Sequence, residues 1–320
     1  YVPKNSSYDG KFRQISVKLD RPGIDVLTRK GYYAVPSTGS PVLNYEIPAL
    51  AALANSQAKD DPAMQAGAFS FPRSNNPGLV PVLVQVPADE FSYEIDKTKN
   101  TYNADFTIVV LIKDQSGQPA GKLSQHYRMS GPADKVDAAK RGEVLFYREA
   151  ELPPGKYSVQ TIAFDTASRK ESEKSTSVEV PQGNGSDLRI SSVALLQRVE
   201  RLSEADKKLD NPFHYGEVLL YPNLGQPLSK ASSKQVAFFC AIFPAKGTAA
   251  APKLDLQVLS GGKSIFDTSP ALGPVDSSGR IQYAGALPLD AFQPGTYSLQ
   301  MTVSDGRTST SRSAEFTVKQ

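Results

Sequence analysis

The hydrophobic residues of this 320-residue chain fall in short runs rich in Val, Ile, Tyr, Phe and Thr, and Gly and Pro residues separate the runs. Such runs, bounded by turn formers, are typical of β-strands. Long stretches with helical period are missing. We therefore expect an all-β protein with three short helices, at Pro48–Asn55, Ala133–Arg141 and Ser203–Leu209. In the last of these, Ser203 and Asp206 have N-terminal capping spacing.

Residues 1–62 predict a hairpin, a short helix and a linker rather than a domain. The hairpin comprises a strand at Phe12–Leu19, a turn at Arg21-Pro22-Gly23 and a second strand at Ile24–Tyr33. Pro followed by Gly suits the two central positions of a type II turn. Because an isolated hairpin is only marginally stable in water, residues 1–36 should dock on another part of the protein.

Residues 63–182 predict a first β-sandwich domain. In Phe106–Ile112 both alternating sets of residues are largely apolar, as expected of a central strand that is covered on both faces. The eight strand candidates are Ala66–Phe71, Leu79–Val86, Phe91–Ile95, Phe106–Asp114, Lys122–Arg128, Val144–Glu151, Lys156–Asp165 and Ser175–Val180.

The turn-rich linker Pro181–Ser186 separates this block from a second predicted sandwich, residues 187–320. Val236–Ile242 is again apolar on both sides, so Cys240 is expected to be a buried small hydrophobic residue rather than a nucleophile. The strand candidates are Leu188–Val199, Gly216–Tyr221, Gln235–Phe243, Leu254–Leu259, Ile281–Leu287, Thr296–Asp305 and Ser311–Val318.

A Pro-Gly-x-Tyr-Ser sequence occurs late in both blocks, with its glycines at Gly155 and Gly295, 140 residues apart. Tyr157 and Tyr297 follow the two glycines, and Asp165 and Asp305 close the two strands at the same spacing. In immunoglobulin-like folds such a tyrosine returns its hydroxyl to the backbone of the corner. The repeat therefore predicts two tandem immunoglobulin or fibronectin type III-like sandwiches, with structural rather than binding roles for the two tyrosines.

Charge and composition exclude several classes of protein. Lys and Arg number 36 against 33 Asp and Glu, a net charge of +3, which is too balanced for the phosphate-neutralising surface of a nucleic-acid-binding protein. The longest apolar run, Val236–Phe243, is too short to span a bilayer. A single cysteine allows neither an internal disulfide nor a multi-cysteine zinc site, and fits a bacterial envelope or a cytosol equally well.

The residues that could be catalytic do not occur in the sequence motifs of known catalytic or metal-binding sites. His126 and His214 are the only histidines, and neither belongs to an H-E-x-x-H or similar motif. A G-x-S-x-G elbow does not occur. Gly261-Gly262-Lys263-Ser264 departs from the phosphate-binding loop because Gln257 stands where a glycine is needed, so we expect a hairpin turn there. We predict no catalytic, cofactor-binding or metal-binding residue and no cofactor.

Several polar and aromatic groups have two interpretations. Asp114–Gly117 and Asp276–Ser278 have turn chemistry, and the Asp60-Asp61 pair is weak evidence for calcium. The aromatic pairs Phe91 with Tyr93 and Phe146 with Tyr147 fit either a sugar-stacking platform or the core, and the absence of Trp lowers the first interpretation.

The N-terminal hairpin is similar to the closing segment of a bacterial family. Its residues are Tyr8–Arg13, Ile15, Val17, Arg21-Pro22-Gly23, Val26, Arg29 and Gly31–Ala34. They resemble the VWFA-related Acidobacterial domain proteins, in which a von Willebrand factor type A-like domain ends in such a hairpin and precedes a long β-rich region. Pro212-Phe213 with Gly216, the Leu-Pro-Pro-Gly-x-Tyr corner and Ala314–Val318 also resemble that region.

The resemblance implies an upstream type A-like domain in the same parent chain, and an exported parent that is secreted, periplasmic or on the cell surface. The D-x-S-x-S metal site of such domains does not occur here, since Asp276–Arg280 breaks the motif at its last position. No metal role is therefore carried over.

Two hypotheses of function follow from the sequence. The first is a non-catalytic, extracytoplasmic binding or structural region that spaces or extends the type A-like domain through contacts with an unknown protein or envelope ligand. Its contacts would come from sandwich loops or an exposed edge strand. The second is a carbohydrate-binding or accessory module of an envelope hydrolase, with a cryptic active site as a weaker variant.

Overall fold

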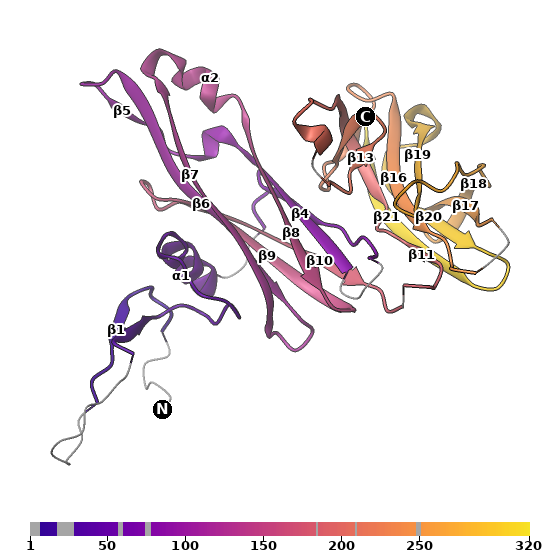
Figure 1. The fold of residues 1–320 in the computed structure, drawn as a ribbon. Helices are drawn as coiled ribbons and strands as arrows, with labels where there is room; N and C mark the ends of the chain where they lie inside the picture. Colours follow the sequence, from indigo (N-terminus) through magenta and orange to yellow (C-terminus); the bar gives the residue numbers. More distant parts are fainter. Residues whose placement is uncertain are drawn as a thin grey trace. The chain divides into compact units, whose positions relative to one another are not determined.

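The computed structural model describes residues 7–17, 29–56, 60–73, 78–183, 185–208, 210–247 and 251–320. Strands account for 53% and helices for 10% of the structure, and the strands form several β-sheets (Figure 1). The prediction of an all-β protein is confirmed.

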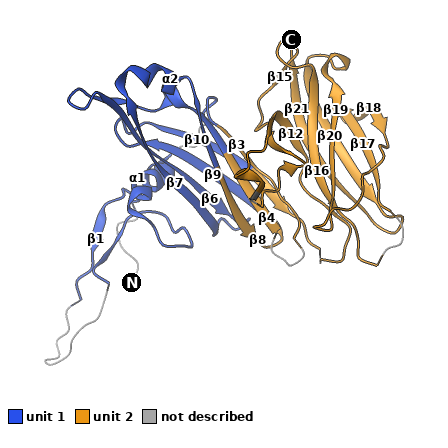
Figure 2. Cartoon of the chain, turned by 45° about the horizontal axis from the view of Figure 1, so that its top comes forward, with its two compact units in different colours: residues 1–64, 84–146, 157–176 blue, residues 65–83, 147–156, 177–320 orange. Residues whose placement is uncertain are grey.

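The chain divides into two compact units (Figure 2). Unit 1 comprises residues 1–64, 84–146 and 157–176, and unit 2 comprises residues 65–83, 147–156 and 177–320. The predicted domains 1–62, 63–182 and 187–320 divide the chain differently and stay a prediction.

The N-terminal hairpin is present where it is described. Strand β1 (Phe12–Gln14) pairs antiparallel with β2 (Gly31–Tyr33), while the turn predicted at Arg21–Gly23 lies outside the described residues. The segment before β1 contacts helix α1 (Ile47–Asn55), because the Asn55 side-chain amide donates to the Tyr8 carbonyl at 2.7 Å. A Cβ at Gly10, whose φ is +71°, would lie 3.2 Å from the Ala51 side chain. The hairpin segment therefore contacts the helix.

Unit 1 is organised around strand β6 (Thr101–Lys113), which pairs antiparallel with β5, β7 and β9. Every residue from Phe106 to Ile112 is buried, as its two apolar faces predicted. Ala49 and Leu50 of α1 pack on Val109, Ile162 and Phe164. The 3-10 turn η1 (Asn44–Glu46) precedes α1. The other elements of the predicted first block are β3 (Gln65–Ala68), β4 (Gly78–Pro87), β5 (Glu94–Asp96), β7 (Pro119–Pro132), β8 (Glu143–Leu152), β9 (Gly155–Asp165), β10 (Glu171–Val180), helix α2 (Val136–Lys140) and the 3-10 turns η2 (Ala88–Glu90) and η3 (Ala133–Lys135).

Unit 2 contains a six-stranded sheet, in the order β11-β16-β12-β14-β13 with β19 also on β16, and a five-stranded sheet in the order β15-β21-β20-β17-β18. Both sheets contribute to one buried cluster, in which Phe238 and Cys240 of β16 pack with Leu299 and Met301 of β20. Its elements are β11 (Arg189–Ile190), β12 (Ala194–Arg201), η4 (Asp206–Lys208), β13 (His214–Tyr215), β14 (Val218–Pro222), β15 (Leu228–Ser229), β16 (Gln235–Phe243), β17 (Lys253–Ser260), β18 (Lys263–Thr268), β19 (Ile281–Pro288), η5 (Leu289–Ala291), β20 (Gly295–Ser304) and β21 (Ser309–Lys319).

Two elements of unit 2 differ from their sequence predictions. The strand expected at Leu188–Val199 is interrupted, because the Ser191 hydroxyl accepts a hydrogen bond from the Ala241 backbone at 2.9 Å in place of a carbonyl. The helix expected at Ser203–Leu209 shortens to one 3-10 turn. Its predicted cap is present, since the Asp206 backbone N–H donates to the Ser203 hydroxyl at 3.1 Å.

The repeated corner has the expected geometry at Tyr297, whose hydroxyl donates to the Gln293 carbonyl at 2.8 Å. Its ring stacks on Phe316 with the centroids 5.3 Å apart, and Tyr157 of unit 1 is equally buried. At the far ends of the two strands, Asp165 accepts from the backbone of Ala167 at 2.8 Å and Asp305 from that of Arg307 at 2.9 Å. The repeat therefore places hydrogen bonds at both ends of β20 and at the far end of β9.

Candidate binding pocket

The two histidines belong to different units, His126 to unit 1 and His214 to unit 2. His126 lies 2.9 Å from an Asp105 carboxylate oxygen and stacks on Tyr45. His214 begins the short strand β13, where burial lowers its pKa. Among the described residues, no group of three or more His, Cys, Asp or Glu side chains could hold a metal ion.

The remaining candidates from the sequence have structural roles. Cys240 is fully buried, and burial raises the pKa of its thiol to about 12. Gly261 and Gly262 have φ values of +55° and +81° and join β17 to β18, so this segment is a hairpin turn. Asp114 and Asp276 accept backbone hydrogen bonds within their own turns. These positions stabilise loops and the core.

In the aromatic pairs that could form a sugar-stacking platform, both phenylalanines are core residues and both tyrosines are half-buried. Phe91 stacks on Phe106 with centroids 3.8 Å apart, and Phe146 is fully buried. Tyr93 packs edge-on against Tyr102. The two phenylalanine faces are therefore not available for stacking a ligand.

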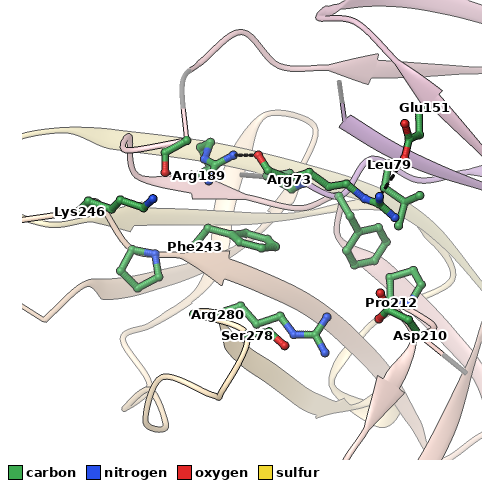
Figure 3. Close-up of a pocket in the computed structure, with 15 residues that line it drawn as sticks. Arg73, Leu79, Glu151, Arg189, Asp210, Pro212, Phe243, Lys246, Ser278 and Arg280 are labelled. Atoms are coloured by element: carbon green, nitrogen blue, oxygen red, sulfur yellow. Dashed lines mark hydrogen bonds and ion pairs between the residues drawn. The ribbon is translucent and has the colours of Figure 1, made fainter. Parts of the chain in front are cut away.

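A pocket of about 660 Å³ in unit 2 is the candidate functional site (Figure 3). Cavities of this size are typical of ligand sites. Six segments that are far apart in the sequence line it. The lining residues are Phe71, Pro72, Arg73, Leu79, Glu151, Gly185, Arg189, Asp210, Pro212, Phe243, Pro244, Lys246, Ser278, Gly279 and Arg280.

Local backbone structure places the charged residues at its edge. Phe71 pairs with Leu79 in an isolated antiparallel bridge, with backbone hydrogen bonds of 2.8 and 3.0 Å, and this bridge fixes Arg73 two residues later. Lys246 follows β16 by three residues, in a segment whose backbone donates to the Ser186 carbonyl at 2.9 Å. Chain segments of high sequence separation thus converge on one cavity.

Two of the four cations in the lining are matched by carboxylates. Arg73 forms an ion pair of 2.9 Å with Glu151, which also lines the pocket. Arg280 forms one of 2.8 Å with Asp276, in the turn before β19. Because these pairs are at least partly exposed, each contributes little to stability, about 0–1 kcal/mol.

Arg189 of β11 has a different environment. It donates to the carbonyls of Arg73 at 2.6 Å and Asp187 at 3.4 Å, and its guanidinium lies 5.5 Å from the centre of the Phe243 ring. Burial lowers its pKa, and the nearby Asp187 carboxylate offsets this only in part. Among the described residues, no carboxylate lies within ion-pair distance of Arg189.

Lys246 lies at the same end of the pocket as Arg189 in Figure 3, and Asp210 lies at the other end beside Pro212. Lys246 is exposed and forms no ion pair with any residue that the structure describes. One end of the cavity therefore carries two cations that form no ion pair with a described residue, and the other end carries mixed charge.

The sequence did not indicate this pocket. Its cations lie between Arg73 and Arg280, each beside a turn, and a lone basic residue beside a turn is common on any surface. The one local signal is proline, since Pro72, Pro212 and Pro244 each lie within two residues of a charged residue. That signal is too general to have identified a site.

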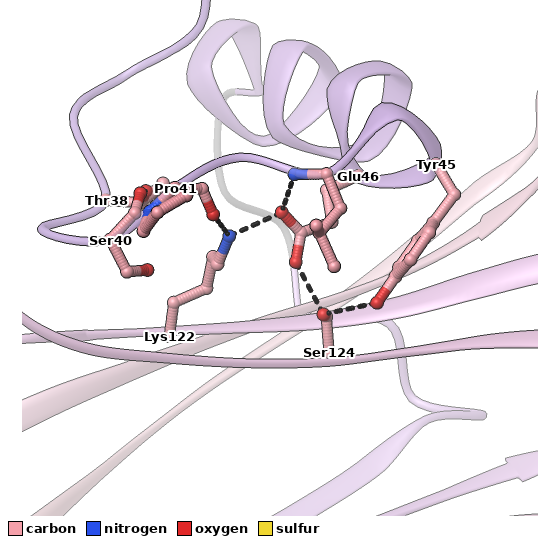
Figure 4. Close-up of polar contacts among 8 residues, drawn as sticks. Thr38, Ser40, Pro41, Tyr45, Glu46, Lys122 and Ser124 are labelled. Carbon is pink, nitrogen blue, oxygen red and sulfur yellow. Dashed lines mark hydrogen bonds and ion pairs between the residues drawn. The ribbon is translucent and has the colours of Figure 1, made fainter.

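A second polar cluster, in unit 1, is closed rather than open (Figure 4). Glu46 is 0% exposed and accepts from the Leu43 backbone at 2.7 Å and from the Ser124 hydroxyl at 2.5 Å. Lys122, whose side chain is 6% exposed, forms an ion pair with Glu46 and donates to the Pro41 carbonyl at 2.7 Å. Every charge in this cluster has a partner within the protein.

Comparison with known proteins yields no family. No family model and no curated protein matches the chain. Among solved structures, trypsin-activated alpha-2-macroglobulin from Escherichia coli matches 81% of this chain and 17% of its own length, at 9% identity and a TM-score of 0.26. The chain thus spans less than a fifth of that protein, and so weak a likeness carries no argument about fold or function. No helix in the described part of the chain is long and apolar enough to cross a membrane.

Proposed function

We propose that this chain is a non-catalytic, extracytoplasmic binding and structural region of a bacterial protein. In this proposal two tandem immunoglobulin or fibronectin type III-like sandwiches space or extend a von Willebrand factor type A-like domain of the same parent chain. The region contacts a protein partner through the pocket of unit 2.

The observation that carries the binding role is the chemistry of the pocket lining. A catalytic site needs a nucleophile or an acid–base group beside its reacting atom. The lining contains neither histidine nor cysteine, and its Glu151 carboxylate is paired with Arg73. Its other groups are mainly guanidinium and ammonium cations, prolines and apolar side chains. Such a set holds a ligand by charge and shape.

The repeated corner supports the tandem arrangement. The hydrogen bond from Tyr297 to the Gln293 carbonyl is similar to the tyrosine-corner bond of immunoglobulin-like domains. Tyr157 occupies the matching position 140 residues earlier and is buried to the same degree. A duplicated sandwich explains both tyrosines, because each would be the corner tyrosine of one copy.

Affinity capture with a matched variant tests the binding role. The purified chain and its Arg189→Met, Lys246→Met variant would each be immobilised and exposed to envelope extract of the source bacterium. We expect one protein to bind the native chain, to bind again when purified separately, and to show a Kd in the micromolar range or lower. Absence of any saturable binding by a purified envelope protein would refute the proposal.

A parallel glycan array tests the second hypothesis. Saturable binding of a neutral sugar, together with no protein partner, would replace the proposal with a carbohydrate-binding module. The reading frame upstream of Tyr1 tests the parentage. A signal peptide followed by a D-x-S-x-S domain is the expected finding, and an upstream domain of unrelated type would contradict it.

A further inference from the structure

The pocket of unit 2 indicates the chemistry of its ligand. Resting on the proposed function, we infer that it binds a carboxylate of an acidic, extended peptide segment, held between Arg189 and Lys246 and packed against Phe243 and Pro244.

The charge of Arg189, which forms no ion pair with a described residue, is the first reason to expect an anionic ligand. A half-buried guanidinium normally finds a carboxylate, because carbonyl dipoles alone repay its desolvation poorly. The hydrogen bonds of Arg189 to described residues go to the carbonyls of Arg73, Asp187 and Gly185, at 2.6 to 3.5 Å, and the nearby Asp187 carboxylate offsets the effect of burial on its pKa only in part. These bonds and the Phe243 ring also hold the side chain in one orientation. A planar guanidinium that is already positioned is well suited to donate hydrogen bonds to a carboxylate.

Lys246 supplies the second charge. Its ammonium lies at the end of the pocket where Arg189 lies, and it has no ion-pair partner among the described residues. An anion between the two would be bound by a guanidinium and an ammonium together. The Arg73–Glu151 and Arg280–Asp276 pairs leave the charge of the rest of the pocket nearly balanced.

The carboxylates of the lining favour a singly charged group over a phosphate. Asp210 and Glu151 face the same cavity, and both repel a dianion more strongly than a single carboxylate. A carboxylate at the Arg189 end lies away from Asp210, which is at the opposite end in Figure 3.

The apolar lining favours a peptide over an acidic sugar. Sugar sites present an open aromatic face, but Phe71 is 3% exposed and packs edge-on against Phe213, and the Phe243 ring lies under Arg189. Leu79 and the prolines at positions 72, 212 and 244 instead offer small apolar surfaces that suit side chains of an extended peptide.

Fluorescence anisotropy with defined probes tests this inference. The full chain would be titrated into a labelled peptide of alternating Glu and Ala, into its Gln–Ala counterpart, and into a labelled oligogalacturonate. We expect the Glu peptide alone to bind with measurable affinity, and its Kd to rise with salt. Arg189→Met and Lys246→Met should each weaken binding about tenfold, as expected for the loss of one charge-assisted contact.

Two further variants control for folding and for charge. Lys246 is exposed, so Lys246→Met should leave the thermal unfolding midpoint unchanged even if Arg189→Met does not fold. Lys263→Met removes an exposed cation of β18 that does not line the pocket, and it should leave peptide binding unchanged. Arg189→Lys keeps the charge but loses the planar fork, and it should recover only part of the affinity.

The outcomes separate this inference from the proposed function. Equal binding of the Glu and Gln peptides, or full affinity in Lys246→Met, would overturn it. Preference for oligogalacturonate would overturn it in favour of an acidic glycan. A purified protein partner that binds the native chain and the double variant equally would leave the proposed function standing and remove the pocket from it.

Discussion

Two buried or half-buried cations, Lys122 and Arg189, differ in the partners that surround their charges. Lys122 in unit 1 is bonded to Glu46 and to the Pro41 carbonyl, and Glu46 is in turn satisfied by Ser124 and the Leu43 backbone. Arg189 in unit 2 faces a cavity, and its hydrogen bonds and ion pairs within the described part of the chain include carbonyls but no carboxylate. A charge whose partners are complete stabilises the structure, whereas a charge without a carboxylate is available to a ligand.

The closed cluster also explains how the N-terminal segment is attached. Glu46 belongs to the turn that leads into α1, and Lys122 and Ser124 belong to β7. The polar contacts of Figure 4 therefore join residues that are more than 70 positions apart. Because both charges are buried, the attachment depends on both being present.

Loss of Lys122 should have the largest effect on stability. In Lys122→Met the carboxylate of Glu46 stays fully buried without its cation, and a broken buried pair costs about 3–5 kcal/mol. Urea unfolding followed by circular dichroism measures the change. Lys156→Met is the matched control, since Lys156 and Glu179 form an exposed pair that should contribute about 0–1 kcal/mol. Equal losses in the two variants would contradict the structural role of Lys122.

Loss of Arg189 should affect stability less and binding more. In Arg189→Met the exposed carbonyls that it bonded regain water, so we expect a loss of about 1–2 kcal/mol. The same urea titration measures it, alongside the peptide titration. A loss as large as that of Lys122→Met would show that Arg189 is a structural cation, and the contrast between the two sites would fail.

The same comparison extends to two tyrosine hydroxyls. Tyr297→Phe removes a bonded hydroxyl and leaves the Gln293 carbonyl without its donor, which should cost about 1 kcal/mol. The Tyr93 hydroxyl is buried without a hydrogen-bond partner in the described part of the chain, and burial raises its pKa. Tyr93→Phe should therefore be neutral or stabilising. Differential scanning calorimetry measures the stability of both variants. A loss of stability in Tyr93→Phe equal to that in Tyr297→Phe would contradict the expected difference between the two hydroxyls.

The smallest effect concerns pH. Burial raises the pKa of Glu173, a hydrogen bond with Ser56 opposes this, and one carboxylate oxygen lacks a partner among the described residues. Below the ordinary pKa of about 4.3 the group is protonated in both states and contributes nothing. As pH rises, the folded protein must ionise a buried carboxyl, so stability falls. Glu173→Gln should therefore stabilise the protein slightly near neutral pH and lose this advantage in acid. Urea titrations across pH measure it, and a pH-independent effect would be contrary to this expectation.

Periodicity predicted the strands that are buried and missed those that are not. Gln235–Phe243 is recovered with its predicted bounds, because burial on both faces requires a continuous apolar run. Strand β18 was missed, since all six of its residues are exposed and its sequence has no apolar face. β13 and β15 have two residues each, too few for any period to appear.

The pocket could not be predicted for a different reason. Arg189 is adjacent to Arg73 because hydrogen bonds between Ser70 and Ser192 bring two distant segments together, and no local pattern encodes that. The break at Ser191 has a similar origin, because its hydroxyl bonds to a strand 50 residues away. Turn chemistry at Asp114 and Asp276 was predictable, since those side chains bond to their own loops.

The buried thiol of Cys240 has a consequence for the fate of misfolded copies. These 320 residues contain one cysteine, so a disulfide needs a second cysteine from outside them, such as one in another copy. In the native fold the thiol is sealed in the core of unit 2 and holds its proton, so it cannot attack. Once the core opens, the thiol becomes accessible. In an oxidising compartment, disulfides would then form selectively between unfolded molecules. Copies that have failed to fold could therefore be recognised by their crosslinks.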